Sequence, residues 1–160
     1  MPLASLASRH LRALTLVSLV AASACESNPT SNPTSNPTRI VDGEASVSSV
    51  RLTVGSQTLT VSSTGTVTGG PITITRPTAP TISASFLNAA GSQDPVAHGG
   101  NFQLNATPAD TSILTFTRTS AFVGTLTGVA AGTTNLNVSL FHVTGGDNDF
   151  GPFPVPATVN

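Results

Sequence analysis

The stretch VRLTVGSQTLTV, Val50 to Val61, carries the pattern that decides the fold. Apolar residues alternate with polar ones on both sides of Gly55-Ser56, at Val50, Leu52, Val54, Leu59 and Val61. Since successive side chains of a strand point to opposite faces, this period of two predicts two strands with one buried face each. A two-residue turn with glycine in its first position is typical of a β-hairpin. The stretch therefore predicts an antiparallel hairpin that contributes to a core.

The same period of two continues along the chain from about Ala45, with Gly or Pro between the segments. Gly69-Gly70 predicts another turn before Ile72 and Ile74. Further strands are expected at 82–86, 102–106, 113–117, 122–127, 133–143 and 153–159. Two sheets that bury alternate residues against each other predict an all-β fold over residues 40–160. The expected form is an immunoglobulin-like β-sandwich of about 7–9 antiparallel strands.

Composition limits the classes of function. The chain has 160 residues, 8% of them charged, and contains no Trp, Tyr or Lys. From residue 26 onward, seven acidic residues face four arginines, which gives a net charge of −3. Because phosphate binding needs clustered Lys and Arg, and single-strand binding adds stacking aromatic residues, we expect no nucleic-acid partner.

The first 24 residues follow the layout of a signal peptide. Arg9 and Arg12 precede an apolar segment of twelve residues at 13–24, which ends in the small residues Ala22-Ser23-Ala24. This segment is shorter than the roughly 20 residues of a membrane-spanning helix. We therefore expect the chain to be exported.

Cys25 follows this segment directly and is the only cysteine. The arrangement resembles the lipobox of bacterial lipoproteins, with Ala22 in place of the usual Leu three residues before the cysteine. The resemblance implies that the Cys25 thiol receives diacylglycerol and anchors the mature chain to the cell membrane or the outer membrane, facing the periplasm or the cell surface. Two or three acyl chains, at about 0.8 kcal/mol per buried methylene, would hold it durably. An ordinary signal peptide followed by an unmodified cysteine is the alternative.

Residues 25–39 contain the tetrapeptide Ser-Asn-Pro-Thr three times, at 27–30, 31–34 and 35–38. Each proline removes a backbone donor and restricts the residue before it, so neither a helix nor a sheet can continue through the segment. We expect a disordered polar linker between the Cys25 anchor and the domain. In an extended state of about 3.1 Å per residue it would span on the order of 40 Å.

The segment GTLTGVAAGTTNLNVSL, Gly124 to Leu140, resembles the C-terminal signature of bacterial Ig-like domains of group two. In that family a strand ends in Gly, here Gly128, and a short turn ends in Ala-Gly-Thr, here Ala131-Gly132-Thr133. The next strand carries alternating apolar residues, as at Leu136, Val138 and Leu140. The resemblance covers about residues 101–160. It implies a surface, adhesive or spacer role in the cell envelope, with an envelope protein or a glycan as the partner.

Catalysis is not expected. Only His98 and His142 remain after removal of the signal, and the chain contains neither a G-x-S-x-G elbow nor a lysine. We therefore expect no catalytic residues and no resident cofactor in the primary hypothesis.

The segment FHVTGGDNDFG, Phe141 to Gly151, nevertheless suggests a metal site. The period of two places His142 on the same inward face as Leu140, at the end of its strand. Asp147 and Asp149 follow on what reads as a long flexible loop at 144–150, and His98 lies in another glycine-rich loop. Imidazole with carboxylate would suit zinc, copper, nickel or iron, and the carboxylates with Asn148 would suit calcium.

Two hypotheses therefore stand. In the first, the chain is a membrane-anchored, non-catalytic Ig-like module that binds a partner or acts as a spacer. In the second, it is a periplasmic or surface lipoprotein that binds a divalent metal ion through His142, Asp147, Asp149 and His98. A third, plainer interpretation is that His142 only forms a hydrogen bond at the sheet edge and that Asp147-Asn148-Asp149 is a polar turn.

Overall fold

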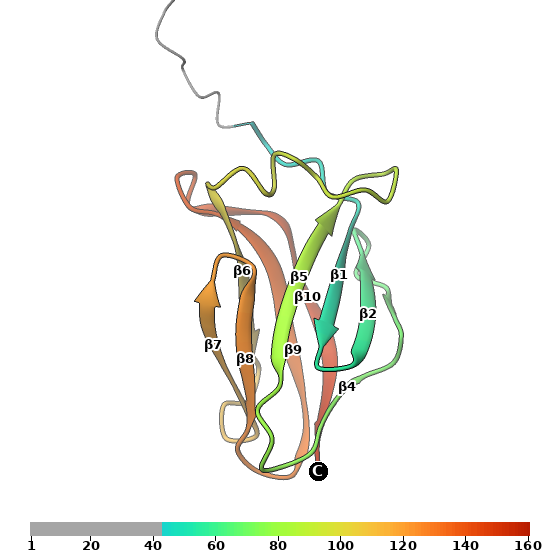
Figure 1. Ribbon diagram of the computed structural model, residues 1–160, viewed down its shortest axis with the longest axis vertical. Coiled ribbons are helices and arrows are strands. Elements are labelled where there is room, and N and C mark those ends of the chain that lie inside the picture. Colours follow the sequence, from blue (N-terminus) through green and yellow to red (C-terminus); the bar gives the residue numbers. More distant parts are fainter. Residues whose placement is uncertain (1–42) are drawn as a thin grey trace, which may run out of the picture. The chain divides into compact units, whose positions relative to one another are not determined.

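Two β-sheets face each other in the computed structural model, which describes residues 43–160 (Figure 1). In chain order the strands are β1 (Ser49–Val54), β2 (Gln57–Ser62), β3 (Val67–Thr68), β4 (Ile72–Ile74), β5 (Thr81–Leu87), β6 (Phe102–Pro108), β7 (Leu114–Ser120), β8 (Val123–Gly128), β9 (Gly132–His142) and β10 (Asp147–Val159). Residues 43–160 contain no helix. The all-β prediction is confirmed for this part of the chain.

The predicted hairpin forms between β1 and β2. Val54 pairs with Gln57 across the turn, and Gly55 has a φ of 56°, a left-handed conformation that glycine adopts without strain. All five alternating apolar residues of the hairpin are buried, with 0–1% of their surface exposed. The period of two therefore identified both the strands and the face that they bury.

The six-stranded sheet has the order β3-β2-β1-β5-β8-β7, and the four-stranded sheet has the order β4-β10-β9-β6. Ten strands thus replace the 7–9 expected, and one pairing, between β4 and β10, is parallel rather than antiparallel. The additional strand, β3, has only two residues, so it is too short to show a period. The parallel pairing joins segments about 85 residues apart, which no local pattern encodes.

The core lies between the two sheets and receives side chains from both. The largest fully buried side chains include Leu52, Ile82 and Phe86 from the six-stranded sheet, and Ile72, Leu104 and Leu140 from the four-stranded sheet. At about 25 cal/mol per Å² of apolar surface, this burial is the main stabilising contribution. The alternating residues predicted for 82–86 and 102–106 are all among the buried set.

Three alternate prolines in β10 limit how this strand can pair. The sequence predicts that Pro152, Pro154 and Pro156 place it at a sheet border, because each lacks a backbone donor. The border prediction is wrong for the strand as a whole, since β10 lies between β4 and β9. However, β4 pairs only with residues Ala157–Val159, which begin directly after the last proline. The prolines thus determine where along β10 a second strand, β4, can pair with it.

Hydrogen bonds connect the two sheets along both flanks. On one flank the Gln57 side chain of β2 donates to the Thr73 carbonyl of β4 at 2.6 Å and accepts from the Thr73 N–H at 2.8 Å. On the other flank the Leu104 N–H of β6 donates to the Ala121 carbonyl at 2.7 Å, and the Arg118 guanidinium of β7 donates to the Leu104 carbonyl at 3.3 Å. Each flank of the sandwich therefore has polar contacts between the two sheets.

The proposed signal peptide (residues 1–24), the Cys25 anchor and the repeat linker (residues 25–39) lie outside the described residues. Within residues 43–160, no helix is both long and apolar enough to span a membrane.

Candidate functional site

His142 is held at the end of β9 by the alternation of that strand. Leu136, Val138 and Leu140 are fully buried, and His142 continues the same face with 3% of its surface exposed. Its imidazole stacks on Phe102 of β6, with ring centroids 4.5 Å apart and an interplanar angle of 22°. The predicted inward orientation of His142 is therefore observed.

Asp147 and Asp149 lie on β10 and not on a long loop. The β9–β10 connection is a turn of four residues, 143–146, in which the Gly146 N–H donates to the His142 carbonyl at 2.8 Å. Asp147 is directly opposite His142 in the antiparallel register. The loop prediction for 144–150 is thus wrong from Asp147 onward, because β9 supplies backbone partners that this polar segment does not signal by itself.

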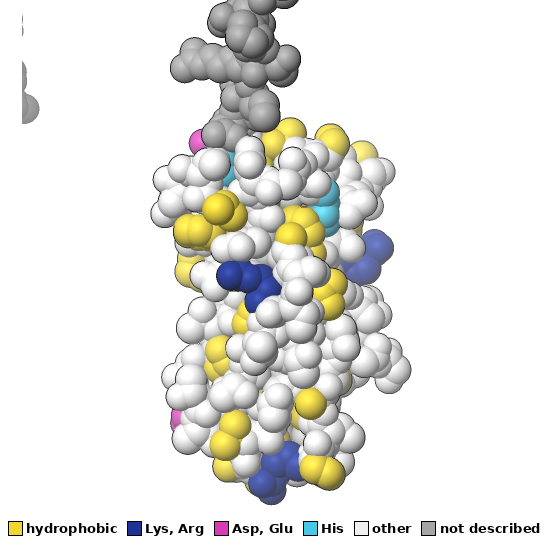
Figure 2. Space-filling view, turned by 60° about the vertical axis from the view of Figure 1, so that its left-hand side comes forward, with side chains coloured by type: hydrophobic (Ala, Val, Ile, Leu, Met, Phe, Trp, Pro, Cys, Tyr) yellow, Lys and Arg dark blue, Asp and Glu magenta, His cyan; other side chains and the backbone are white. Residues whose placement is uncertain are grey.

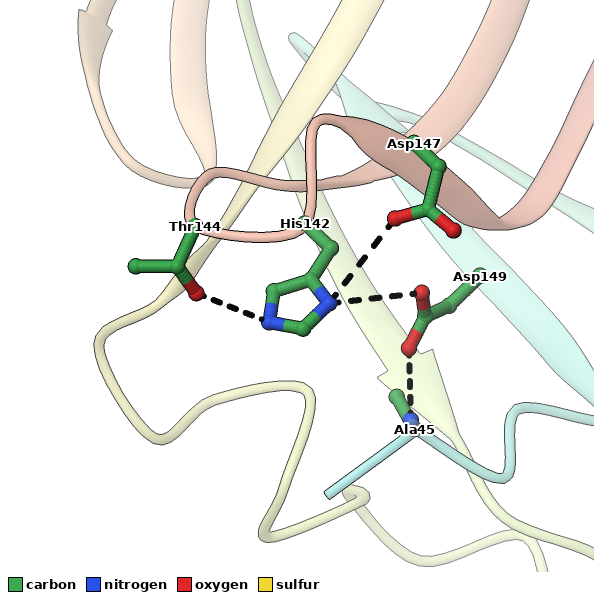
Figure 3. Close-up of polar contacts among 5 residues, drawn as sticks. All are labelled: Ala45, His142, Thr144, Asp147 and Asp149. Carbon is green, nitrogen blue, oxygen red and sulfur yellow. Dashed lines mark hydrogen bonds and ion pairs between the residues drawn. The ribbon is translucent and has the colours of Figure 1, made fainter. Parts of the chain in front are cut away.

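Both carboxylates face the same nitrogen of His142 (Figure 3). His142 Nδ1 lies 3.9 Å from Asp147 Oδ1 and 3.9 Å from Asp149 Oδ1. On the other side of the ring, Nε2 is 3.0 Å from the hydroxyl of Thr144, within hydrogen-bond range. A separation of 3.9 Å is too long for a hydrogen bond, so the two carboxylates do not accept a direct bond from Nδ1.

The two carboxylates differ strongly in exposure. The Asp147 side chain is 62% exposed, whereas the Asp149 side chain is 1% exposed. Asp149 Oδ2 accepts a hydrogen bond of 2.6 Å from the Ala45 N–H (Figure 3), which joins the segment before β1 to β10. Asp149 Oδ1 is buried and has no hydrogen-bond partner among residues 43–160.

Glu44 is a further member of the site that the sequence did not indicate. Ligand atoms of Glu44, His142 and Asp149 all lie within 4.8 Å of one another. Glu44 is exposed and stands outside any strand, about 100 residues before its neighbours. Its only signal in the sequence is its position next to Ala45, where the alternating apolar pattern begins.

His98 is not among these converging residues. Its Nε2 accepts a hydrogen bond of 3.2 Å from the Phe86 N–H, and its ring lies 4.4 Å from that of Phe122. The loop is held by Asp94, whose carboxylate accepts the N–H groups of Val96 and Ala97. Burial lowers the pKa of His98 below its ordinary value of 6.5 because it disfavours the charged ring. Nε2 can accept the Phe86 N–H only while it carries no proton, so its lone pair is already engaged.

The order hydroxyl, imidazole and carboxylate at Thr144, His142 and Asp149 has the sequence of groups found in a nucleophilic triad. In a triad the carboxylate orients the ring through a hydrogen bond to Nδ1, which the 3.9 Å separation does not allow. The arrangement is better suited to holding a cation, because an imidazole nitrogen and several carboxylate oxygens converge on one space.

The face of the domain drawn in Figure 2 carries few charged side chains. This face has isolated arginine, histidine and acidic side chains and scattered hydrophobic groups among uncharged polar side chains and backbone. The exposed large hydrophobic residues of the described region are Val96, Val129 and Val143. Single exposed apolar residues are normal for a soluble surface.

Searches against protein-family models and against curated proteins found no match for this chain.

Proposed function

We propose that the chain is an exported lipoprotein, anchored through Cys25, whose Ig-like module performs a non-catalytic binding or spacing role in the cell envelope. The observation that carries this proposal is the order of the segments. An apolar segment ending in Ala22-Ser23-Ala24 precedes the only cysteine, a proline-rich repeat follows, and a two-sheet module comes last. This order is expected for an anchor, a tether and a displayed domain.

The Ig-like part of the proposal is supported by where the strands end and begin within residues 124–140. β8 ends at Gly128 and β9 begins at Gly132, as the resemblance to group-two bacterial Ig-like domains implies. Two facing sheets with mostly antiparallel pairing and a shared core agree with such a sandwich. A fold of this kind hosts many functions, so it supports a module and not a reaction.

A binding or spacing role agrees with the surface. The described surface has few charges, its large exposed hydrophobic residues are few, and prolines limit strand addition along β10. An envelope protein or a glycan is the partner that this polar, weakly charged surface fits.

Metabolic labelling with a palmitate analogue in a bacterial host tests the anchor. The wild-type chain should incorporate the label and sediment with membranes, whereas Cys25→Ser should do neither. A matched control carries Cys25→Ser together with Ser27→Cys. This variant keeps one thiol but shifts it by two residues toward the C-terminus. This control should stay unlabelled. Equal labelling of all three chains, or no labelling of the wild type, would contradict the proposal.

A further inference from the structure

The Asp149 carboxylate is buried, and only one of its two oxygens accepts a hydrogen bond from the described residues. One oxygen accepts the Ala45 N–H, and the other has no hydrogen-bond partner within residues 43–160. No arginine of this region forms a salt bridge with Asp149, Asp147 or Glu44. A buried charge is unfavourable unless a positive group is nearby, so this carboxylate calls for a cation.

The surrounding atoms have the separation that a shared ion requires. Bonds of 2.0–2.2 Å from nitrogen or oxygen to zinc place two ligands of one ion between about 3.4 Å apart, at a tetrahedral angle, and about 4.2 Å apart, on opposite sides. His142 Nδ1 lies 3.9 Å from both Asp147 Oδ1 and Asp149 Oδ1, inside this range. The ligand atoms of Glu44, His142 and Asp149 lie within 4.8 Å of one another, so the exposed Glu44 side chain would have to move closer to share the ion.

Gly145 allows the turn to approach these ligands closely. A Cβ placed on Gly145 would lie 2.7 Å from His142 Nδ1 and 2.6 Å from Asp147 Oδ1. A larger residue at this position would therefore clash with both ligand atoms. Asp147 and Glu44 are exposed, so the site has two solvent-accessible carboxylates beside the buried Asp149 oxygen.

We propose that His142 Nδ1, Asp149 Oδ1 and a Glu44 carboxylate oxygen bind a divalent first-row transition metal ion, with Asp147 as a fourth ligand. The imidazole nitrogen favours zinc and similar ions over calcium, which prefers oxygen ligands alone. Thr144 orients the ring: when Nε2–H donates to the Thr144 hydroxyl, the lone pair of Nδ1 faces the carboxylates.

The ion would connect the segment before β1, which contains Glu44, to the β9–β10 hairpin. Glu44 precedes Ala45, whose N–H already donates to Asp149, and β1 follows four residues later. The bound ion would therefore fix the segment that leads into the domain. This site does not depend on the lipid anchor, so a failed palmitate experiment leaves it untouched.

Calorimetric titration of the full chain, purified in a mild non-ionic detergent and freed of metal with a chelator, tests the proposal. Zinc chloride should bind with a stoichiometry near one, and calcium chloride should give no more than weak heat. Zinc should also raise the thermal unfolding temperature of the domain, because it binds only the folded arrangement. Glu44→Gln and Asp149→Asn should each weaken zinc binding by more than about tenfold.

Two control variants make the result specific. His98→Asn removes the other imidazole of the domain, and Asp110→Asn removes an exposed carboxylate at the opposite end of β6. Both should bind zinc as the wild type does. Glu44 is exposed, so Glu44→Gln keeps the fold even if Asp149→Asn does not. Absence of zinc binding by the wild type, or equal binding by the wild type and Glu44→Gln, would overturn the proposed site.

Discussion

Replacing Phe86 with leucine is the sharpest test of the core. Phe86 is fully buried, and its ring contacts those of Phe122 and Phe150 in edge-to-face pairs, each with centroids 5.9 Å apart. Each pair contributes about 0.5–1.5 kcal/mol beyond the buried area. The change of shape adds about 1 kcal/mol. Phe86→Leu should therefore lower the free energy of unfolding by about 2–4 kcal/mol.

Phe153→Leu is the matched control. Phe153 is only partly buried and forms one ring pair, with Phe150, at 5.0 Å. Its replacement should cost about 1 kcal/mol. For a domain of this size, 1 kcal/mol corresponds to about 4 °C in the unfolding temperature. Phe86→Leu should therefore lower the unfolding temperature by about 8–16 °C and Phe153→Leu by about 4 °C.

Thermal unfolding followed by far-UV circular dichroism measures both variants, since the chain has no Trp or Tyr for intrinsic fluorescence. The signal should be that of a β protein in both cases. A shift for Phe86→Leu no larger than that for Phe153→Leu would refute the inward orientation of β5 and the aromatic cluster built on it.

Two further predictions concern the flank contacts and pH. Gln57→Leu removes both hydrogen bonds to the Thr73 backbone and should lower the free energy of unfolding by about 1 kcal/mol. An unchanged free energy of unfolding, measured in urea, would show that water replaces the amide at no cost in stability. Because burial holds the pKa of His98 below 6.5, the unfolded chain binds more protons than the folded one, so stability should fall as the pH drops below 6.5. Unfolding temperatures at about pH 7.5 and about pH 5.5 should differ less in His98→Gln than in the wild type, and an unchanged difference would contradict this origin.

The sequence predicted the elements whose signal is local. The Gly55 turn, the alternation on both sides of it and the inward position of His142 all depend on residues a few positions apart. The period of two was sufficient there because one face of each strand is buried. The start of β10 escaped prediction because aspartate has low strand propensity. Asp147 pairs with His142 only through the backbone, and Asp149 falls at an irregularity between Asn148 and Phe150.

The composition of the candidate site was predictable only in part. His142, Asp147 and Asp149 are close in sequence, and the hairpin brings them together. Glu44 joins them across about 100 residues, a contact that no spacing indicates. His98 shares the residue type of a metal ligand, but its nitrogen accepts a backbone N–H from β5 instead. Whether the group binds a metal stays a prediction.

The polar contacts along the two flanks determine how the domain comes apart. Gln57 on one side and Leu104 with Arg118 on the other each join a strand of one sheet to a strand of its partner. Separation of the two sheets therefore requires these bonds to break together with the loss of the shared core. We therefore expect loss of structure to be all-or-none, with no populated species in which a single sheet survives.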